Sequence, residues 1–489
     1  MKLRWALRGG GALAAAAAVV LATASSAAAA VPITKISADT FTNPSSQHAT
    51  QAEPDSFSYG STVVAAIQTG RFFDGGSSGI AFSTSTDNGA TWTTGNLPGI
   101  TKYFAGPYDR VSDPAVAYDA RHNVWLISTL ALTEVGGVSG AAVLTSRSID
   151  GGHTWSATPS VVTTNGDVDK NWIACDNTAT SPFYGRCYTE WDVFSQGDRI
   201  KMSTSTDGGL TWGGAVSPKG SPAGLGGQPV VQPSGTVVVP IANANETAIG
   251  AFVSTNGGGS WSRPVVIANV AEHTVAGNLR TGPLPSAEID ATGKVYVVWQ
   301  DCRFRSGCPS NDIVMSTSTN GTTWSAPTRI PIDPTTSTVD HFIPGIGVDR
   351  TTSGSSAHLA LTYYYYPTAN CTAATCALNV GFVTSANGGS SWSAPTQVTG
   401  PMNLSWLPDT SQGRMVGDYI STSFGSNGLA HGFFAVANAP TGAVFDQALY
   451  TNTTGWSVTG GAIAADVWSG SSTPNNPGAA HRNAFVHAH

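Results

Sequence analysis

Charged and polar residues that could carry chemistry stand just before a series of short apolar segments. Only 11% of the 489 residues are charged, so their concentration at these positions is informative. Three arginines among them, Arg110, Arg280 and Arg414, come from well-separated parts of the chain. A planar guanidinium binds a carboxylate through two parallel hydrogen bonds, so three that converge would select an acidic ligand.

The remaining members of this set are mostly acids. The full set is Glu53, Asp55, Asp109, Arg110, Asp113, Asp167, Asp169, Lys170, Gln228, Arg280, Asp340, His341, Arg414, Asp418 and Tyr419. Carboxylates next to a tyrosine and a histidine offer proton transfer and nucleophilic attack. The structural alternative is that loops begin with polar residues and that Asp caps turns.

A short sequence motif that ends in tryptophan, called the phrase below, recurs along the chain about every 60 residues. This period indicates a repeated supersecondary unit. Its first copy runs from Ser85 to Trp92, and the later copies end at Trp155, Trp212, Trp261, Trp324 and Trp392. The acidic position is Asp87, Asp150 and Asp207 in the first three copies and Asn in the others. Asp or Asn closes a turn by accepting backbone hydrogen bonds, and Gly supplies the positive φ that the turn needs.

Each phrase is expected to be a hairpin tip between the two outer strands of a unit. Residues 80–83 form a short apolar strand before the first phrase, and residues 114–118 and 124–127 predict two further strands upstream of the second. Four antiparallel strands per unit, repeated radially, predict an all-β fold, a β-propeller of four-stranded antiparallel blades. Inner strand pairs begin near Asp55, Asp113, Trp172, Pro229, Pro285, Pro344 and Val416, which favours seven blades over six.

The phrase resembles the Asp-box, or BNR repeat, of propellers in the sialidase-like superfamily. The resemblance extends from about Gln51 to Trp456. It implies that the boxes lie at the rim of the ring, away from the catalytic centre. Asp87, Asp150 and Asp207 are therefore expected to be structural, and the chemistry is expected at the mouth where the inner strands converge.

Sialidases carry their functional residues in the order Arg, Asp, Glu, Arg, Arg, Tyr, and the resemblance implies the same roles here. The residues in that order are Arg110, Asp113, Glu190, Arg280, Arg414 and Tyr419. Tyr419 would be the nucleophile paired with Glu190, Asp113 the acid–base, and the arginines the carboxylate clamp. Asp418 and His341, at the same mouth, are expected to contact substrate. Arg303, Arg305 and Glu288 are rivals for the arginine and carboxylate roles.

Two other functions fit the same ring. A polysaccharide lyase acting on uronic acids would use His341 and Tyr419 with Arg280 or Arg414. A non-catalytic glycan-binding propeller would use aromatic platforms at residues 363–366, Trp191 and Trp406. No cofactor and no metal ion are expected, because the string of residues 167–171 lacks the Gly and the distal Glu of a calcium loop.

The two ends of the chain predict an exported protein. Residues 1–30 combine Lys2, Arg4 and Arg8 with an apolar run and a small-residue cleavage site near Ala30, as in a secretory signal peptide. Residues 31–50 are expected to be a lead-in, 51–460 the propeller and 461–489 a C-terminal tail. We expect a secreted monomer whose partner is an extracellular glycan or polysaccharide.

Cysteine spacing and charge agree with that location. The six cysteines fall into three neighbouring pairs, Cys175 with Cys187, Cys302 with Cys308, and Cys371 with Cys376, which predicts three local disulfides. A net charge of −7 offers no basic face for nucleic acid. No later stretch is long and apolar enough to predict a membrane span.

Overall fold

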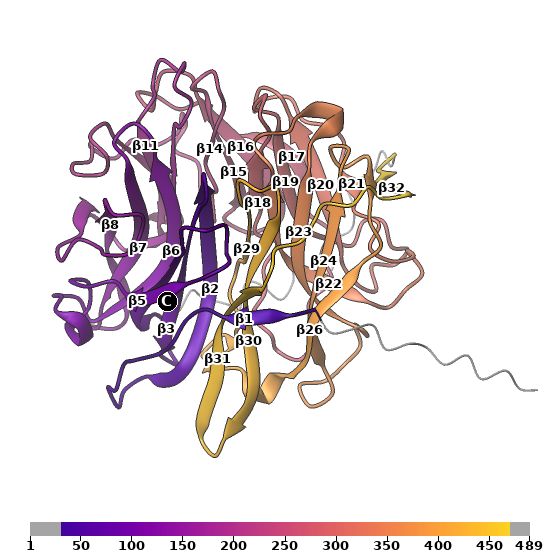
Figure 1. Ribbon diagram of the computed structural model, residues 1–489, viewed down its shortest axis with the longest axis horizontal. Helices are drawn as coiled ribbons and strands as arrows, with labels where there is room; N and C mark the ends of the chain where they lie inside the picture. The colour runs from indigo at the N-terminus through magenta and orange to yellow at the C-terminus, as the bar shows by residue number, and fades with distance from the viewer. Residues whose placement is uncertain (1–30, 470–489) are drawn as a thin grey trace, which may run out of the picture. The chain divides into compact units, whose positions relative to one another are not determined.

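The computed structural model describes residues 31–469, which form β-strands joined by turns (Figure 1). The helical elements in this range are four short 3₁₀ turns at Lys102–Phe104, Phe194–Gln196, Gly354–Ser356 and Leu404–Trp406. None of the described helices has the length and apolar character that a membrane span requires. The predicted signal peptide and most of the predicted tail, residues 1–30 and 470–489, lie outside the described range.

The first sheet has eight strands in two antiparallel halves. Its first half consists of β2 (Gln47–Tyr59), β3 (Thr62–Arg71), β4 (Ser77–Ser85) and β5 (Thr93–Asn96). Its second half consists of β6 (Arg110–Asp119), β7 (Val124–Thr133), β8 (Ser139–Ser148) and β9 (Ser160–Thr163). A single residue pair, Ser77 with Val111, joins the two halves into one sheet.

The middle of the chain forms three further sheets. The first has three strands, β10 (Val168–Cys175), β11 (Cys187–Val193) and β12 (Lys201–Ser205). The second has five, β13 (Gly224–Leu225), β14 (Val230–Val231), β15 (Val237–Asn243), β16 (Ala248–Ser254) and β17 (Val265–Asn269). The third has five, β18 (Ser286–Ile289), β19 (Val295–Asp301), β20 (Asp312–Ser318), β21 (Thr328–Arg329) and β33 (Asp466–Val467).

Two four-stranded sheets complete the set. One consists of β22 (Asp340–Val348), β23 (Leu359–Tyr366), β24 (Ala377–Ser385) and β26 (Thr396–Asn403). The other consists of β29 (Ser421–Phe424), β30 (Ala430–Thr441), β31 (Val444–Asn452) and β1 (Ile33–Lys35). Two short ribbons pair β25 (Ser391–Trp392) with β32 (Ile463–Ala464), and β27 (Asp409–Thr410) with β28 (Gly413–Arg414).

The innermost strands follow one another around a closed ring. Contacts run from β2 to β6, β10, β14, β18, β22 and β29, and β29 contacts β2 again. All strand pairs within the sheets are antiparallel. The predicted all-β propeller is therefore confirmed.

The prediction of seven separate four-stranded blades is wrong. Five of the described sheets reach four or more strands, and the sheet of β10, β11 and β12 stops at three. Residues 213–223, which come after β12, contain three Gly and two Pro, which weaken a strand. They contribute only two isolated bridges, Val216 with Met202 and Ala223 with Arg199. The first sheet does not divide into two separate blades, because Ser77 of β4 pairs with Val111 of β6. The Ser77 hydroxyl adds a hydrogen bond to the Val111 carbonyl, at 2.7 Å.

The six boxes form hairpin tips in which a Ser hydroxyl donates to the side chain of Asp or Asn, and four of them add an indole hydrogen bond. In the first, the Ser85 hydroxyl donates to Asp87 Oδ1 at 2.7 Å and the Thr91 N–H donates to the same oxygen at 2.9 Å. The Thr91 hydroxyl and N–H lower the pKa of Asp87 to about 2. The Trp92 indole donates to the Gly89 carbonyl and packs edge-on against Phe433 of the last sheet. The box is therefore a turn that anchors a tryptophan between neighbouring sheets.

The three predicted disulfides are confirmed. Cys175–Cys187 links neighbouring strands β10 and β11, while Cys302–Cys308 and Cys371–Cys376 each close a short loop. None of the six cysteines is free. Because each bridge spans 12 residues or fewer, it restrains one hairpin or loop rather than the whole ring.

Candidate functional site

Two small cavities lie among the inner strands. The first, about 10 Å³, has room for a single water molecule and is lined by Asp113, Lys170, Asn171, Trp172, Gly226, Gln228, Leu284 and Tyr419. The second, about 50 Å³, is lined by residues from β2, β6, β10, β14, β18, β22 and β29. Trp172 and Gln228 border both cavities, so the two lie next to each other among the inner strands.

A repeated β-bulge holds polar side chains at this place. The strand register shifts at Glu53 in β2, at Asp113 in β6, at Lys170 in β10 and at Ile343 in β22. All four residues have a positive φ, between 48° and 58°. A bulge bends its strand and turns the extra residue away from the regular alternation of faces. Equivalent bulges thus place two acids and one lysine in equivalent positions of neighbouring inner strands.

Asp418 is the link between the cationic groups of the cluster. It accepts hydrogen bonds from Arg280 Nε at 2.8 Å and Nη2 at 2.5 Å, and from Lys170 Nζ at 2.5 Å. Its backbone N–H donates to Glu53 Oε1 at 3.2 Å, and Gln68 donates to the other Glu53 oxygen. All of these side chains are at least four-fifths buried, so their charges act through little solvent.

The cluster carries a net positive charge at neutral pH. Burial and the nearby Asp113 carboxylate raise the pKa of Glu53 to about 8, so its neutral form prevails at pH 7. Burial opposes ionisation of Asp418, but Arg280 and Lys170 outweigh it and hold its pKa well below the usual range. Arg71 belongs to the same network, since it interacts with Glu53, Asp113 and Asp418. Arg71, Lys170 and Arg280 are therefore three cations around the Asp418 carboxylate.

Tyr419 lies at the edge of this cluster. Its ring packs edge-on against Trp172 with 4.9 Å between centroids, and its hydroxyl donates to the Pro114 carbonyl at 3.2 Å. Burial, followed by the Glu53 and Asp113 carboxylates, raises the pKa of Tyr419 well above its ordinary value. The phenol is therefore neutral and has acids as neighbours.

Two acceptor atoms at the first cavity have no hydrogen-bond partner among the described residues. They are Asp113 Oδ2 and Asn171 Oδ1, both buried. The Asn171 amide nitrogen donates to the Asp113 carbonyl at 3.1 Å and to the Ser128 hydroxyl at 2.9 Å, which fixes the orientation of the amide. A ligand that donates hydrogen bonds, such as a hydroxyl group, would satisfy both acceptors.

The structure brings Asp113, Arg280, Asp418 and Tyr419 together and leaves the other predicted arginines outside the cluster. Arg110 pairs with Asp74 at 2.5 Å and Glu134 at 2.8 Å, and it stacks on the Phe72 ring. The Arg414 backbone accepts from the Arg280 N–H, but its guanidinium donates to the Leu407 carbonyl at 2.8 Å. The three guanidinium groups therefore have separate partners.

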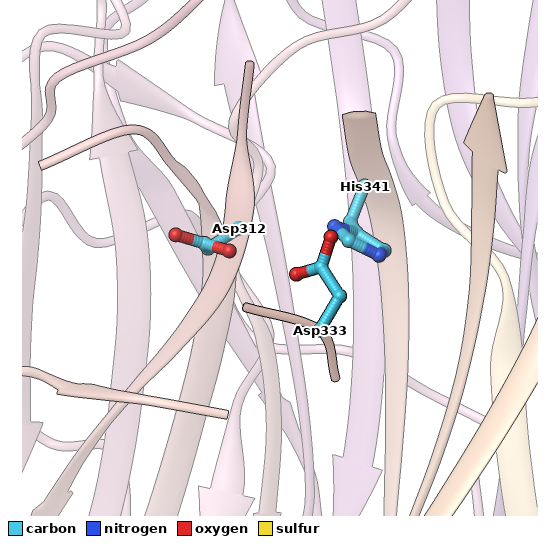
Figure 2. Close-up of side chains that lie close together, drawn as sticks. All are labelled: Asp312, Asp333 and His341. Carbon is cyan, nitrogen blue, oxygen red and sulfur yellow. The ribbon is translucent and has the colours of Figure 1, made fainter. Parts of the chain in front are cut away.

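Glu190 lies on the strand next to the cluster, paired with Trp172, whereas His341 lies elsewhere in the ring. Glu190 is buried on β11 against Gly227, and burial raises its pKa well above the ordinary value. The acids that act on the Tyr419 hydroxyl are instead Glu53, Asp113, Asp55 and Asp418. His341 lies on β22 beside Asp312 and Asp333 (Figure 2).

Sequence reasoning overlooked Arg71, did not select Glu53 and Lys170 from the polar set, and considered Asn171 only as part of a calcium loop. A signal for the bulges does exist. Each of Glu53, Asp113, Gln228, Leu284 and Ile343 directly precedes a proline. Proline is confined to the start of strands and to bulges in sheets. The residue before that proline lines the first cavity at Asp113, Gln228 and Leu284.

Comparison with known proteins supports the repeat. Residues 61–285 match the family described as a BNR repeat-like domain. A solved protein of unknown function from Dyadobacter fermentans is 15% identical with a TM-score of 0.46, over 73% of this chain and 98% of that chain. The intramolecular trans-sialidase of Ruminococcus gnavus is 13% identical with a TM-score of 0.39. The match covers 81% of this chain and 91% of that chain. No curated protein sequence matches the chain.

A polysaccharide lyase of family PL25, an ulvan lyase, is 10% identical with a TM-score of 0.49, over 87% of this chain and 96% of that chain. Similarity at these values transfers no activity to the present chain. The family match over residues 61–285 agrees with the six turns, each of which has a Gly N–H that donates to a Ser hydroxyl. Residues 61–285 of this all-β propeller are therefore similar to a BNR repeat-like domain.

Proposed function

We propose that this propeller is a secreted, carbohydrate-active enzyme that removes acidic sugars from the ends of extracellular glycans. The observation that carries the proposal is the position of Tyr419. Its phenol lies between Trp172 and a buried, net positive cluster of Arg71, Lys170 and Arg280 with Glu53, Asp113 and Asp418. Such a site offers an anionic sugar a cationic binding group, an apolar wall and a neutral nucleophile.

In this proposal Arg280 and Lys170 bind the sugar carboxylate, and Asp418 positions both through its hydrogen bonds. Tyr419 attacks the anomeric carbon while Glu53 takes the phenol proton, in the minority of molecules whose Glu53 has lost its own proton at pH 7. Asp113 gives a proton to the leaving oxygen as the glycosidic bond breaks. Water then attacks the same carbon and Asp113 takes its proton. The tyrosyl bond breaks, and Glu53 returns its proton to the released Tyr419 oxygen. A carboxyl group with a pKa of about 8 is a stronger base toward tyrosine than an ordinary glutamate.

The proposal changes the partner of Tyr419 and the make-up of the carboxylate clamp. Glu53 takes the place that the resemblance gave to Glu190, because Glu53 is the carboxyl group that raises the pKa of Tyr419 most. Lys170 joins Arg280 in place of Arg110 and Arg414, whose guanidinium groups have other partners.

The two alternatives have less support. A lyase that uses His341 with Tyr419 needs the two side chains at one site, and His341 instead contacts the Asp312 and Asp333 cluster. A binding protein that uses aromatic platforms needs exposed rings, but Tyr363, Tyr364, Tyr366 and Trp191 are buried. Secretion is supported by three disulfides, which persist outside the cell.

A substrate screen tests the proposal. The full chain is incubated with fluorogenic sialosides and with uronic-acid polymers, and both reducing ends and ultraviolet absorbance are followed. We expect reducing sugar from sialosides without the absorbance of an unsaturated product. Arg280→Gln should raise KM at least about tenfold because it removes a bidentate cation. Arg121→Gln, a change at an arginine that bonds the Tyr184 carbonyl, is the matched control. Absorbance gain, or no reaction on either class, would contradict hydrolysis.

A further inference from the structure

A second group of chemically capable side chains lies between two neighbouring sheets. Asp312 begins β20, Asp333 follows β21, and His341 lies in β22. One carboxylate oxygen from each aspartate and one ring nitrogen of His341 all lie within 4.8 Å of one another. Figure 2 shows the carboxylate of Asp333 between Asp312 and the imidazole.

Two buried arginines occupy only one oxygen of each carboxylate. Arg305 Nη2 donates to Oδ1 of Asp312 and of Asp333, both at 2.7 Å. Arg329 pairs with the same two Oδ1 atoms, at 2.9 and 2.8 Å. The Oδ2 atoms of both aspartates are buried and have no hydrogen-bond partner among the described residues. A buried carboxylate oxygen without a donor is costly, so these atoms require a further partner.

The imidazole is held as a metal-binding histidine is held. His341 Nδ1 lies 3.2 Å from the Asn311 carbonyl, and because a carbonyl only accepts, Nδ1 is the donor. The ring also contacts Tyr363 and Tyr365, with centroids 5.5 and 6.2 Å away. Donation of one ring N–H to a backbone carbonyl fixes the tautomer and the orientation of metal-binding histidines. His341 is thus positioned by three neighbouring groups.

We propose that Asp312, Asp333 and His341 bind one divalent cation of the zinc class. Two carboxylate oxygens and one imidazole nitrogen form a three-ligand set that leaves an open position. The two arginines balance the charge of the two aspartates, so the site gains little from charge attraction alone. The coordinate bond to nitrogen must then contribute much of the affinity, which favours Zn²⁺ over Ca²⁺.

The geometry sets a condition on binding. In a tetrahedral site with bonds near 2.1 Å, ligand atoms lie roughly 3.4 Å apart, so the three side chains must approach one another by about 1 Å. Asp333 is in the loop after β21 and is the least buried of the three, so it is the side chain that moves most easily. A bound water molecule is the competing partner for the two oxygens, and it would leave the site without affinity for metal.

Zinc titration of the full chain tests the site. His481, His487 and His489, which lie outside the described residues, are first changed to Gln so that they cannot bind metal. We expect one equivalent of Zn²⁺ in isothermal titration calorimetry. His341→Gln should weaken it by more than about 100-fold, whereas His358→Gln, a change at a more exposed histidine, should not.

A spectroscopic measurement covers the case in which His341→Gln does not fold. Co²⁺ added to the unmodified site should give visible absorption bands of a low-coordinate nitrogen and oxygen site, and Zn²⁺ should remove them. Absence of Zn²⁺ binding, binding unchanged in His341→Gln, or binding of Ca²⁺ without Zn²⁺ would each overturn the proposal. The readouts do not depend on glycosidase activity.

Discussion

At the scale of single residues, the centre of the ring is defined by side chains that meet from distant parts of the chain. Lys170 and Asp418 are 248 residues apart in sequence and share a hydrogen bond of 2.5 Å. Glu53 lies beside them and holds a proton that an exposed glutamate would release. The same residues that support catalysis in our proposal therefore make folding stability depend on pH.

We predict that stability falls as pH rises from about 4.5 to about 8. Folded Glu53, with a pKa of about 8, keeps a proton over this range that the unfolded chain has lost. Burial also raises the pKa of Asp55 and Asp340 to about 7, which adds to the same trend. Urea unfolding at pH 5 and at pH 8 measures the fall in the free energy of unfolding.

The variant Glu53→Gln isolates the contribution of one residue. Its stability should fall less between pH 5 and pH 8 than that of the wild type, by on the order of 2 kcal/mol. The comparison uses the change in the free energy of unfolding between pH 5 and pH 8. A loss of stability that is the same at both pH values, such as one from the altered hydrogen bond to Gln68, therefore does not affect the comparison. Equal slopes in both proteins would show that Glu53 is ionised throughout.

The sequence predicted which residues stand near the mouth but not where each side chain points. Arg110 begins β6, and the bulge at Asp113 changes the face of the strand between them. Asp113 therefore reaches the cavity, while Arg110 pairs with Asp74 and Glu134. The order of the Arg, Asp, Glu and Tyr residues along the chain does not show which face of a strand each side chain occupies. The arginine clamp therefore could not be tested from that order alone.

At the scale of elements, the Asp-box was predictable because it is local. All of its hydrogen bonds join residues within five positions of one another, so the motif specifies its own geometry. In the fourth copy Asn256 accepts from Ser254 and Ser260 as an aspartate would, and its amide donates back to the Ser260 hydroxyl. The number of strands per sheet was less predictable, because it depends on pairing between distant segments.

Substitutions at Asp150 test this view of the box. Asp150→Ala removes four hydrogen bonds, from the Ser148 hydroxyl, from the His153 N–H and from the N–H and hydroxyl of Thr154. It should lower the free energy of unfolding by about 1–2 kcal/mol. Asp150→Asn should cost less than half as much, since Asn occupies the position in three other copies. Thermal denaturation measures both. A similar loss in the two variants would mean that charge, not the turn, determines the role of this residue.

At the scale of the whole propeller, the ring closes by pairing the start of the described chain with its last full sheet. Strand β1 pairs with β31, and the Ile36 N–H donates to the Leu449 carbonyl at 2.9 Å. The Ile36 side chain packs among Val63, Ala65 and Phe433, which belong to the first and last sheets. The residues expected to be a lead-in thus contribute a strand to the sheet that β29, β30 and β31 form.

Ring closure predicts a large effect at Ile36. Ile36→Ala should lower the free energy of unfolding by about 2–4 kcal/mol, because it leaves a cavity between the first and last sheets. Ile149→Ala, at an exposed position of the second box, should change it by no more than about 0.5 kcal/mol. Chemical denaturation compares the two. An equally small effect at Ile36 would mean that β1 is not needed to close the ring.

The most direct test of the central claim is the turnover of a fluorogenic sialoside by Tyr419→Phe. The ring still packs on Trp172, and the lost hydrogen bond to Pro114 should cost only about 1 kcal/mol of stability. Tyr365→Phe, at a partly buried tyrosine on β23, is the matched control. We predict that kcat falls at least about 1,000-fold in Tyr419→Phe and stays near the wild-type value in Tyr365→Phe. Wild-type turnover by a folded Tyr419→Phe protein would contradict the account.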